Sequence, residues 1–154
     1  MQTKNLLKSV IFDIDNTIID IRKITELYTK EEMALEDWEL LEAHYLEAPG
    51  ISGMLELVRI LSNQYFIIFL TARMDKPEVR QNTEMHLKEL FGDMPFRLLM
   101  RPLGAEEADF IVKEEVYEKE INGKYDVEFC FDDREDVRNL WQRKGLLTLQ
   151  VHQI

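Results

Sequence analysis

The sequence Val10-Ile11-Phe12-Asp13-Ile14-Asp15-Asn16-Thr17 runs from an apolar stretch into two carboxylates two residues apart, followed by a hydroxyl. Val10 to Phe12 are branched or aromatic and uncharged, which is typical of a strand buried on both faces. Burial is expected to end at Asp13, because an unpaired charge is costly inside a core. Open α/β sheets bind ligands at the carboxyl ends of their strands. The stretch therefore predicts a metal site, an acid/base pair or a carboxylate nucleophile with a helper, and an Asp-rich turn that only caps the strand is the simpler alternative.

The rest of the chain alternates apolar runs with helical patterns. Residues 29–32 have the form of a capping box, and apolar residues at helical spacing follow them as far as residue 48. Further helices are predicted over residues 51–63, 77–90 and 108–121, and from about residue 137 to 145. Strands are predicted over residues 10–12, 66–70, 96–100, 127–131 and 146–151. This alternation predicts an α/β protein with a three-layer α/β/α Rossmann-like fold and a mainly parallel sheet.

Length and composition limit the fold and the partners. A chain of 154 residues without repeats or linkers predicts one domain over residues 1–154. The formal charge of −11, from 30 acidic and 19 basic residues, argues against broad non-specific binding to duplex nucleic acid, although a local basic patch stays open. No apolar run approaches the ~20 residues of a membrane span, and residues 1–8 show no signal-peptide pattern. We therefore expect a cytoplasmic protein with no membrane partner, and nothing indicates an obligate protein partner.

The chain has one cysteine, Cys130, which excludes an internal disulfide and fits a reducing compartment. Cys130 lies inside an apolar run that is predicted to be a strand. A buried side chain without a catalytic role is therefore the prediction.

Polar side chains follow the predicted strands or begin a helix in four clusters. These clusters are Asp13/Asp15/Thr17, Thr71/Arg73, Asp109/Lys113 and Asp132/Asp133. In a parallel sheet the strand ends share one edge, so the clusters are expected to meet there. Acids packed so closely would repel one another and take up protons unless a cation compensates them. Oxygen ligands suit Mg²⁺ more than Zn²⁺, and the lysine and arginine suit a phosphate.

Asp109 and Lys113 also fit a simpler interpretation. They lie four residues apart on one predicted helix with the acid first, which is the favourable arrangement of an ordinary surface ion pair.

Taken in order, these residues resemble the four motifs of the haloacid-dehalogenase-like (HAD) phosphohydrolases, and the likeness spans residues 10–151. A closer similarity, to the phosphatase domain of phage-type polynucleotide kinase/3′-phosphatases, rests on Leu70-Thr71-Ala72-Arg73, Leu99-Met100-Arg101-Pro102, Val112-Lys113-Glu114-Glu115 and Phe131-Asp132-Asp133-Arg134. No G-x-x-x-x-G-K-[ST] loop of a kinase occurs, so we expect the phosphatase module alone. Asn16 stands where glycine is common in the family, and we expect the turn to tolerate it.

The resemblance implies roles for the acids. Asp13 would attack phosphorus and form an aspartyl-phosphate. Asp15 would protonate the leaving alkoxide and then take a proton from the attacking water. Mg²⁺ would be held by Asp13, the backbone carbonyl of Asp15 and Asp133, with Asp132 in the same acidic group and orienting the site. The presence of Asp15 favours phosphoryl transfer over cleavage of a carbon–halogen bond, which needs no such proton donor.

The resemblance also implies roles for the residues that meet the substrate. Thr71 and Lys113 would bind the non-bridging phosphate oxygens. Asp109 would hold Lys113 in place, and Arg73 is a candidate fork for a substrate phosphate. Arg101 is a further candidate for substrate contact.

The expected substrate is the 3′ end of a polynucleotide, and two alternatives to this function stay open. The HAD-like fold here has a small helical insert at about residues 26–48 and no large cap domain, so an open site can admit a polynucleotide 3′ end. Basic residues near the active edge can contact nucleotide phosphates: Arg22, Lys23, Lys76, Arg80, Arg101 and Arg134. The first alternative is a small-molecule phosphatase for nucleoside monophosphates, with Trp38 or Tyr45 covering the base. The second, less favoured, is a binding module without catalysis.

Overall fold

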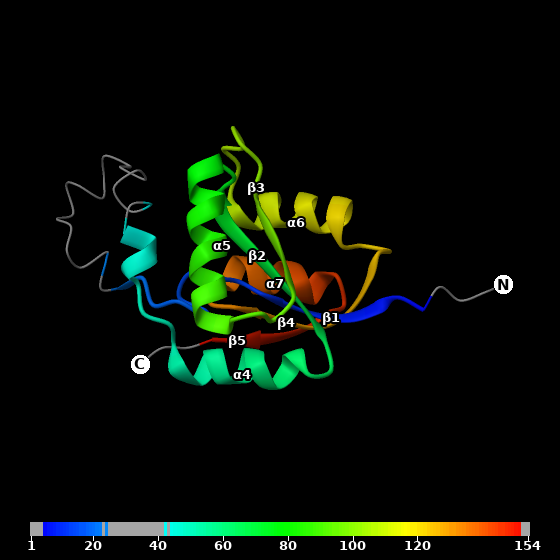
Figure 1. Ribbon diagram of the computed structural model, residues 1–154. Coiled ribbons are helices and arrows are strands. Elements are labelled where there is room, and N and C mark those ends of the chain that lie inside the picture. Colours follow the sequence, from blue (N-terminus) through cyan, green and yellow to red (C-terminus); the bar gives the residue numbers. More distant parts are fainter. Residues whose placement is uncertain (1–4, 23, 25–41, 43, 152–154) are drawn as a thin grey trace.

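The structure, a computed structural model, describes residues 5–22, 24, 42 and 44–151. Its strands are β1 (Leu7–Phe12), β2 (Phe66–Met74), β3 (Phe96–Arg101), β4 (Tyr125–Asp132) and β5 (Leu147–Gln150) (Figure 1). Its helices are α4 (Ser52–Ser62), α5 (Pro77–Phe91), α6 (Asp109–Glu120) and α7 (Glu135–Arg143), with a short 3₁₀ helix η1 (Tyr45–Glu47). Most of the helix predicted over residues 29–48, and with it most of the expected insert, lies outside the described residues; of its end, Tyr45–Glu47 form the 3₁₀ helix η1.

The five described strands form one sheet in the order β3-β2-β1-β4-β5, and every neighbouring pair is parallel. Phe12 at the end of β1 is in register with Phe69 of β2 and Phe131 of β4. The residues that follow these three therefore come out at the same edge of the sheet. The predicted parallel α/β fold is confirmed, and it brings distant sequence motifs to one place.

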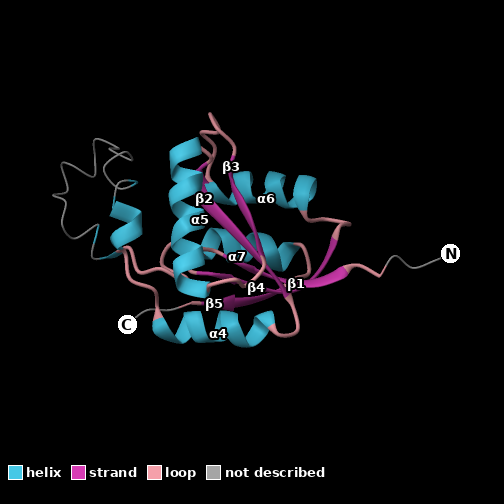
Figure 2. Ribbon diagram, in the orientation of Figure 1, coloured by secondary structure: helices cyan, strands magenta, loops and turns pink. Residues whose placement is uncertain are grey.

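The sheet is covered by helices on both faces, as Figure 2 shows by the strands lying between the helices. Alternate strand residues divide between two buried clusters. Phe12 and Phe69 pack with residues of α4 and α5 such as Val58 and Leu87. On the other face the cluster joins the sheet to α6 and α7, with Ile11, Ile68, Leu70, Val116 and Trp141 among its members. Burial on both faces explains why the strands read as continuous apolar runs.

Strand β2 is longer than the sequence pattern indicated. We expected it to end at Leu70, but it continues through Thr71 and Arg73, and Met74 pairs with Arg101 of β3 after a shift in register. Polar residues did not end the strand, because Thr71 and Arg73 are buried with hydrogen-bond partners. Two predicted site residues therefore lie on a rigid strand.

Two smaller expectations can be compared with the structure. Cys130 is buried and unpaired in β4, which confirms its predicted position. Within the described ranges, no helix combines the length and the apolar character that crossing a membrane would require.

Candidate active site

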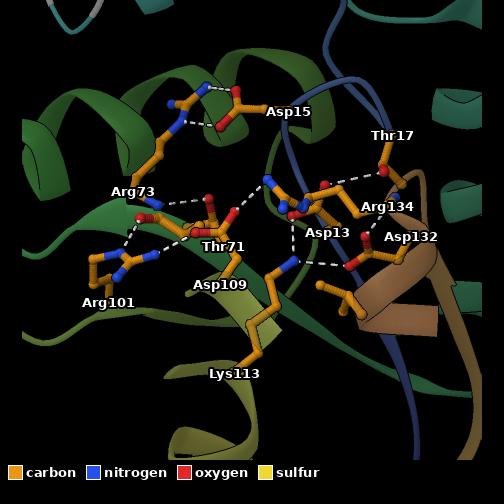
Figure 3. A network of polar contacts seen from close by, with 12 residues as sticks. Asp13, Asp15, Thr17, Thr71, Arg73, Arg101, Asp109, Lys113, Asp132 and Arg134 are labelled. Carbon is orange, nitrogen blue, oxygen red and sulfur yellow. Dashed lines mark hydrogen bonds and ion pairs between the residues drawn. The ribbon is translucent and has the colours of Figure 1, made fainter. Parts of the chain in front are cut away.

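The polar residues predicted from the four motifs meet at the carboxyl edge of the sheet (Figure 3). Asp13 follows β1 and Thr71 lies in β2, while Lys113 extends from α6 and Asp132 ends β4. All four are buried. Buried polar groups must be paired to be tolerated, and each of these has a partner in the structure.

Asp13 is held on both of its carboxylate oxygens. The Thr17 hydroxyl donates to Oδ2 at 3.1 Å, and the Lys113 ammonium donates to Oδ1 at 2.8 Å. The Asp13 backbone N–H donates to the carbonyl of Phe131 at 3.0 Å, which fixes the residue to the end of β4. The carboxylate thus has a defined orientation before any substrate arrives.

Lys113 is only 2% exposed, so the interpretation as an ordinary surface pair with Asp109 is wrong. Its ammonium donates to Asp13 Oδ1 and to Asp132 Oδ2, both at 2.8 Å. Burial lowers the pKa of Lys113, but the carboxylates of Asp13 and Asp132 raise it by more than burial lowers it. The net pKa therefore lies above the ordinary lysine value. Lys113 is a permanent positive charge between two acids.

Asp13, Asp132 and Asp133 form a compact acidic group. One carboxylate oxygen of each lies within 4.8 Å of the others. Burial raises the pKa of Asp13 to about 8, with Lys113 opposing the rise and Asp132 and Asp15 adding to it. Burial and the charge of Asp132 likewise raise the pKa of Asp133. Three converging oxygens with too little positive charge around them fit a hard divalent cation.

The Asp15 carboxylate does not join the three-acid group and contacts Arg73 instead. Arg73 holds its carboxylate by a two-bond fork, Nε to Oδ2 at 2.9 Å and Nη2 to Oδ1 at 2.6 Å, and donates a third bond to Thr83 at 3.1 Å. Arg73 is therefore engaged with Asp15 rather than open as a fork for substrate. The carboxyl group of Asp15 lies outside the three-acid group, so an expected metal contact through Asp15 is left to its backbone carbonyl.

Asp109 has different partners from the expected one. It accepts a hydrogen bond from Arg101 and an ion pair from Arg134 at 3.0 Å, while Lys113 turns to Asp13 and Asp132. The expectation that Asp109 holds Lys113 is wrong, because the Asp109 carboxylate pairs with arginines of β3 and the β4–α7 loop while the Lys113 ammonium pairs with two other acids. Arg101 is buried and bound to protein groups. Its predicted contact with substrate stays a prediction.

Thr71 is buried at the site, and its hydroxyl accepts a hydrogen bond from the backbone N–H of Arg73 at 3.2 Å. The hydroxyl hydrogen stays able to donate to a phosphate oxygen. The predicted role of Thr71 as a phosphate-binding group stays a prediction.

The other basic residues near the active edge are mostly paired with acids. Arg22 contacts Asp20 at 2.8 Å, and Arg80 contacts Asp75 at 2.6 Å. Lys76 contacts Glu42 at 3.2 Å. Lys23, Trp38 and the side chain of Tyr45 lie outside what the structure describes, so their expected contacts stay predictions.

Arg138 is a residue that the motifs did not indicate. Its guanidinium donates to the backbone oxygens of Asp133 and, at 3.5 Å, Asp132. Its only sequence signal is its position on the helix after the acid pair, one turn beyond Arg134. Arg138 satisfies the carbonyls of the loop that presents both acids.

Asn16 occupies a left-handed backbone conformation with φ of 60°. This conformation favours glycine, and asparagine tolerates it better than most residues. The Asn16 side-chain oxygen also accepts a hydrogen bond from the backbone N–H of Ile21 at 3.3 Å. The expected tolerance of the turn for Asn16 agrees with this geometry.

Comparison with known proteins bears on this site. The family described as "Polynucleotide kinase PNKP phosphatase domain" matches residues 7–153. A protein of Autographa californica nuclear polyhedrosis virus, described as "Putative bifunctional polynucleotide kinase/RNA ligase", is 32% identical over 87 residues, which are 55% of this chain and 12% of that protein.

Two solved structures resemble this chain. A chain of the Pnkp1/Rnl/Hen1 RNA repair complex is 27% identical with a TM-score of 0.77, over 98% of this chain and 44% of that chain. YfnB from Bacillus subtilis, bound to magnesium, shares the fold with a TM-score of 0.62 at 14% identity, over 94% of this chain and 88% of that one. The chain spans less than half the length of the polynucleotide kinase relative and of the repair-complex chain. With a family match over nearly its whole length and the motif residues gathered at one sheet edge, the chain belongs to the phosphatase domains of polynucleotide kinases of the PNKP type, which are HAD-like phosphatases.

Proposed function

We propose that this domain is a Mg²⁺-dependent phosphomonoester hydrolase that works through a phosphorylated Asp13 and removes the 3′-phosphate from a polynucleotide end. The observation that carries the proposal is the placement of Asp13, a buried carboxylate fixed by Thr17 and Lys113 beside two further acids. Membership of the PNKP-type phosphatase domains supports the phosphatase chemistry.

In the first half of the reaction, an oxygen of Asp13 forms a bond to phosphorus while the bond from phosphorus to the ester oxygen breaks. Asp15 gives a proton to the departing alkoxide, so that the alcohol leaves neutral. Arg73 orients the Asp15 carboxyl group through its two-bond fork. Lys113 places a positive charge near the oxygens of the transferring group.

In the second half, a water molecule attacks the phosphorus of the aspartyl-phosphate. Asp15 takes the proton that this water releases, which returns Asp15 to its starting state. The bond between Asp13 and phosphorus breaks, and inorganic phosphate leaves. Thr71 and Lys113 donate hydrogen bonds to the phosphate oxygens in both halves.

Asp13 and Asp133, with the backbone carbonyl of Asp15, would hold the Mg²⁺ ion, and Asp132 would orient the group. When bound, Mg²⁺ would supply positive charge that offsets the acids and the phosphate oxygens. Burial raises the pKa values of Asp13 and Asp133, and the positive charge of Lys113 offsets only part of the rise, which supports a cation beside these acids. YfnB, which shares the fold, is bound to magnesium.

The choice of a polynucleotide end as substrate rests on the relatives. One is described as a polynucleotide kinase/RNA ligase, and others are chains in an RNA repair complex. Those names describe the relatives, and we extend to this chain only the class of substrate, a phosphorylated nucleic-acid end. A cytoplasmic location stays a prediction, supported by the unpaired Cys130.

A nucleoside monophosphate is the second candidate substrate, and one observation favours it. Arg22, Lys76 and Arg80 are each paired with an acid, so they offer little free positive charge to a nucleic-acid backbone. A small phosphoester would not need such charge.

A substrate panel separates the two candidates. Release of phosphate from a 3′-phosphorylated oligonucleotide is compared with release from 3′- and 5′-mononucleotides, with Mg²⁺ and with EDTA. A polynucleotide phosphatase should prefer the oligonucleotide, and only that reaction should fall steeply as salt increases. Equal rates on the mononucleotides, with no salt effect, would contradict the polynucleotide assignment while keeping the phosphatase.

A further inference from the structure

Arg101 is a buried arginine, and each of its three guanidinium nitrogens donates to a protein group. It is 9% exposed at the end of β3, and its Nε donates to the backbone oxygen of Ala72 at 2.9 Å. Nη1 donates to the backbone oxygens of Ala105 at 3.3 Å and Glu107 at 2.8 Å, and Nη2 donates to Asp109. A guanidinium can meet four acceptors in fixed directions, which a lysine ammonium cannot do with the same geometry.

The acceptors of Arg101 belong to two parts of the active edge. Ala72 lies in β2 between Thr71 and Arg73, two of the residues at the site. Asp109 is the first residue of α6, the helix that carries Lys113. One buried side chain therefore fixes the end of β2 relative to the start of α6.

Asp109 also contacts Arg134, and so connects it to Arg101. Its second oxygen pairs with the Arg134 guanidinium at 3.0 Å, so Asp109 lies between two arginines (Figure 3). The backbone N–H of Arg134 donates to Asp132 at 3.0 Å, which places Arg134 beside the acidic group. The Arg134 side chain is 50% exposed. The side of its guanidinium that does not face Asp109 contacts Asp136, which is more exposed than Asp109, at 2.9 Å.

We propose that Arg101 is a positioning residue of the phosphatase site, which acts through Asp109 to direct the guanidinium of Arg134 toward the substrate phosphate. The proposal rests on the function proposed above. Asp109 holds one side of the Arg134 guanidinium at 3.0 Å and the exposed Asp136 holds the other at 2.9 Å, so an arriving phosphate competes with Asp136 while the contact to Asp109 keeps the guanidinium in place. A displacement of such a group by about 1 Å costs about 10²-fold in rate.

A double-mutant cycle tests the proposal. Arg101→Lys keeps the charge but loses the fork, and kcat/KM on a 3′-phosphorylated oligonucleotide should fall about 10- to 100-fold. In an Arg134→Gln background the same change should cost less than about threefold, because Arg134 no longer needs to be directed. A role in folding alone would instead lower kcat/KM equally in both backgrounds, and that result would overturn the inference.

Arg97→Lys is the matched control. Arg97 lies on the same strand and pairs with Glu120 at 2.5 Å, at the end of β3 away from the site. This variant should keep kcat/KM within about threefold of the unchanged protein. A loss as large as that of Arg101→Lys would overturn the inference, because any arginine of β3 would then have the same effect.

Circular dichroism and thermal unfolding establish that each variant is folded. Should Arg101→Lys not fold, the outer contact is tested with Asp109→Asn and Arg134→Gln, whose combined loss should not exceed the larger single loss; additive losses would overturn the inference. An unchanged protein that hydrolyses no phosphomonoester would reject the proposed function itself. Normal turnover by the parent together with normal turnover by Arg101→Lys would reject only the role of Arg101.

Discussion

At the scale of single residues, the site depends on one lysine buried among acids. Lys113 contacts Asp13 and Asp132 at equal distances of 2.8 Å, and Asp133 lies beside them without a comparable partner among the described side chains. One positive charge thus faces three carboxyl groups. Burial raises the pKa of Asp13, Lys113 offsets only part of that rise, and the charge of Asp132 adds to it, so a divalent cation would be favoured beside these acids.

Replacing the nucleophile tests the role of Asp13. Asp13→Asn keeps the shape and the hydrogen bond from Lys113 but removes the attacking carboxylate, so turnover should fall by about 10⁴-fold or more. The thermal unfolding midpoint should not fall by more than a few degrees, because a buried carboxylate is replaced by a neutral group. Asp126→Asn, an exposed change on β4, is the control and should retain full activity. Ordinary hydrolysis by Asp13→Asn would disprove the nucleophile.

Replacing the arginine that holds Asp15 tests the orientation of the acid/base group. Arg73→Lys cannot contact both Asp15 oxygens and Thr83 together, so kcat should fall by about 10- to 100-fold. Steady-state kinetics should show a smaller change in KM than in kcat, since Arg73 is occupied by Asp15. A rise in KM with an unchanged kcat would instead make Arg73 a substrate-binding residue.

Residue types could be predicted from the sequence better than residue partners. The motif spacing indicated Asp13, Thr17, Lys113 and Asp132 as one site, and the structure brings them together. The pairing of Arg73 with Asp15 joins residues 58 positions apart, and local pattern contains no information about it. The prediction that Asp109 pairs with Lys113 was wrong for a related reason. Spacing along a helix shows which residues are neighbours, but it does not show which groups outside the helix each side chain contacts.

At the scale of elements, the hydrophobic pattern of the sequence predicted the described strands and helices, but it did not predict where each of them ends. β2 continues through Thr71 and Arg73 because hydrogen bonds inside the protein replace the solvent that polar residues usually need. The same extension places both side chains on a strand instead of a loop, which favours precise positioning.

The turn after β1 gives a test at this scale. Asn16 has φ of 60°, so Asn16→Ala should lower the free energy of unfolding by about 1–2 kcal/mol. Asn16→Gly relieves the backbone and loses only the side-chain contact to Ile21, so its effect should be smaller. Urea unfolding measures both variants. A larger loss for glycine than for alanine would contradict the strained geometry.

Helix α7 supports the loop that presents Asp132 and Asp133, and Trp141 anchors it. Trp141 is 1% exposed and packs against Tyr117 with ring centroids 5.5 Å apart. Trp141→Ala should lower the free energy of unfolding by about 3–5 kcal/mol. Ile60→Ala, a change at a residue that is 56% exposed on α4, should change it by less than about 0.5 kcal/mol. Equal effects in denaturant unfolding would contradict the described core.

At the scale of the whole molecule, a parallel sheet gathers residues from all parts of the chain at one edge. The order β3-β2-β1-β4-β5 puts β1 in the centre, so Asp13 has neighbours from β2 and β4 on its two sides. The site is therefore a property of the complete fold. No single segment contains it.

Binding of magnesium should be visible without activity. Because Mg²⁺ binds the folded acidic group and not the unfolded chain, millimolar MgCl₂ should raise the thermal unfolding midpoint, and EDTA should reverse the rise. NaCl at equal ionic strength is the control, and Asp133→Asn should reduce the effect. An identical rise in Asp133→Asn would show that the ion binds elsewhere.

The covalent intermediate tests the central claim most directly. The protein is mixed with an oligonucleotide carrying a ³²P-labelled 3′-phosphate and Mg²⁺, quenched in acid within milliseconds, and digested to peptides. The label should appear on the peptide that contains Asp13, and it should be absent from Asp13→Asn and from samples with EDTA. Rapid release of labelled phosphate without any label on that peptide would contradict the account.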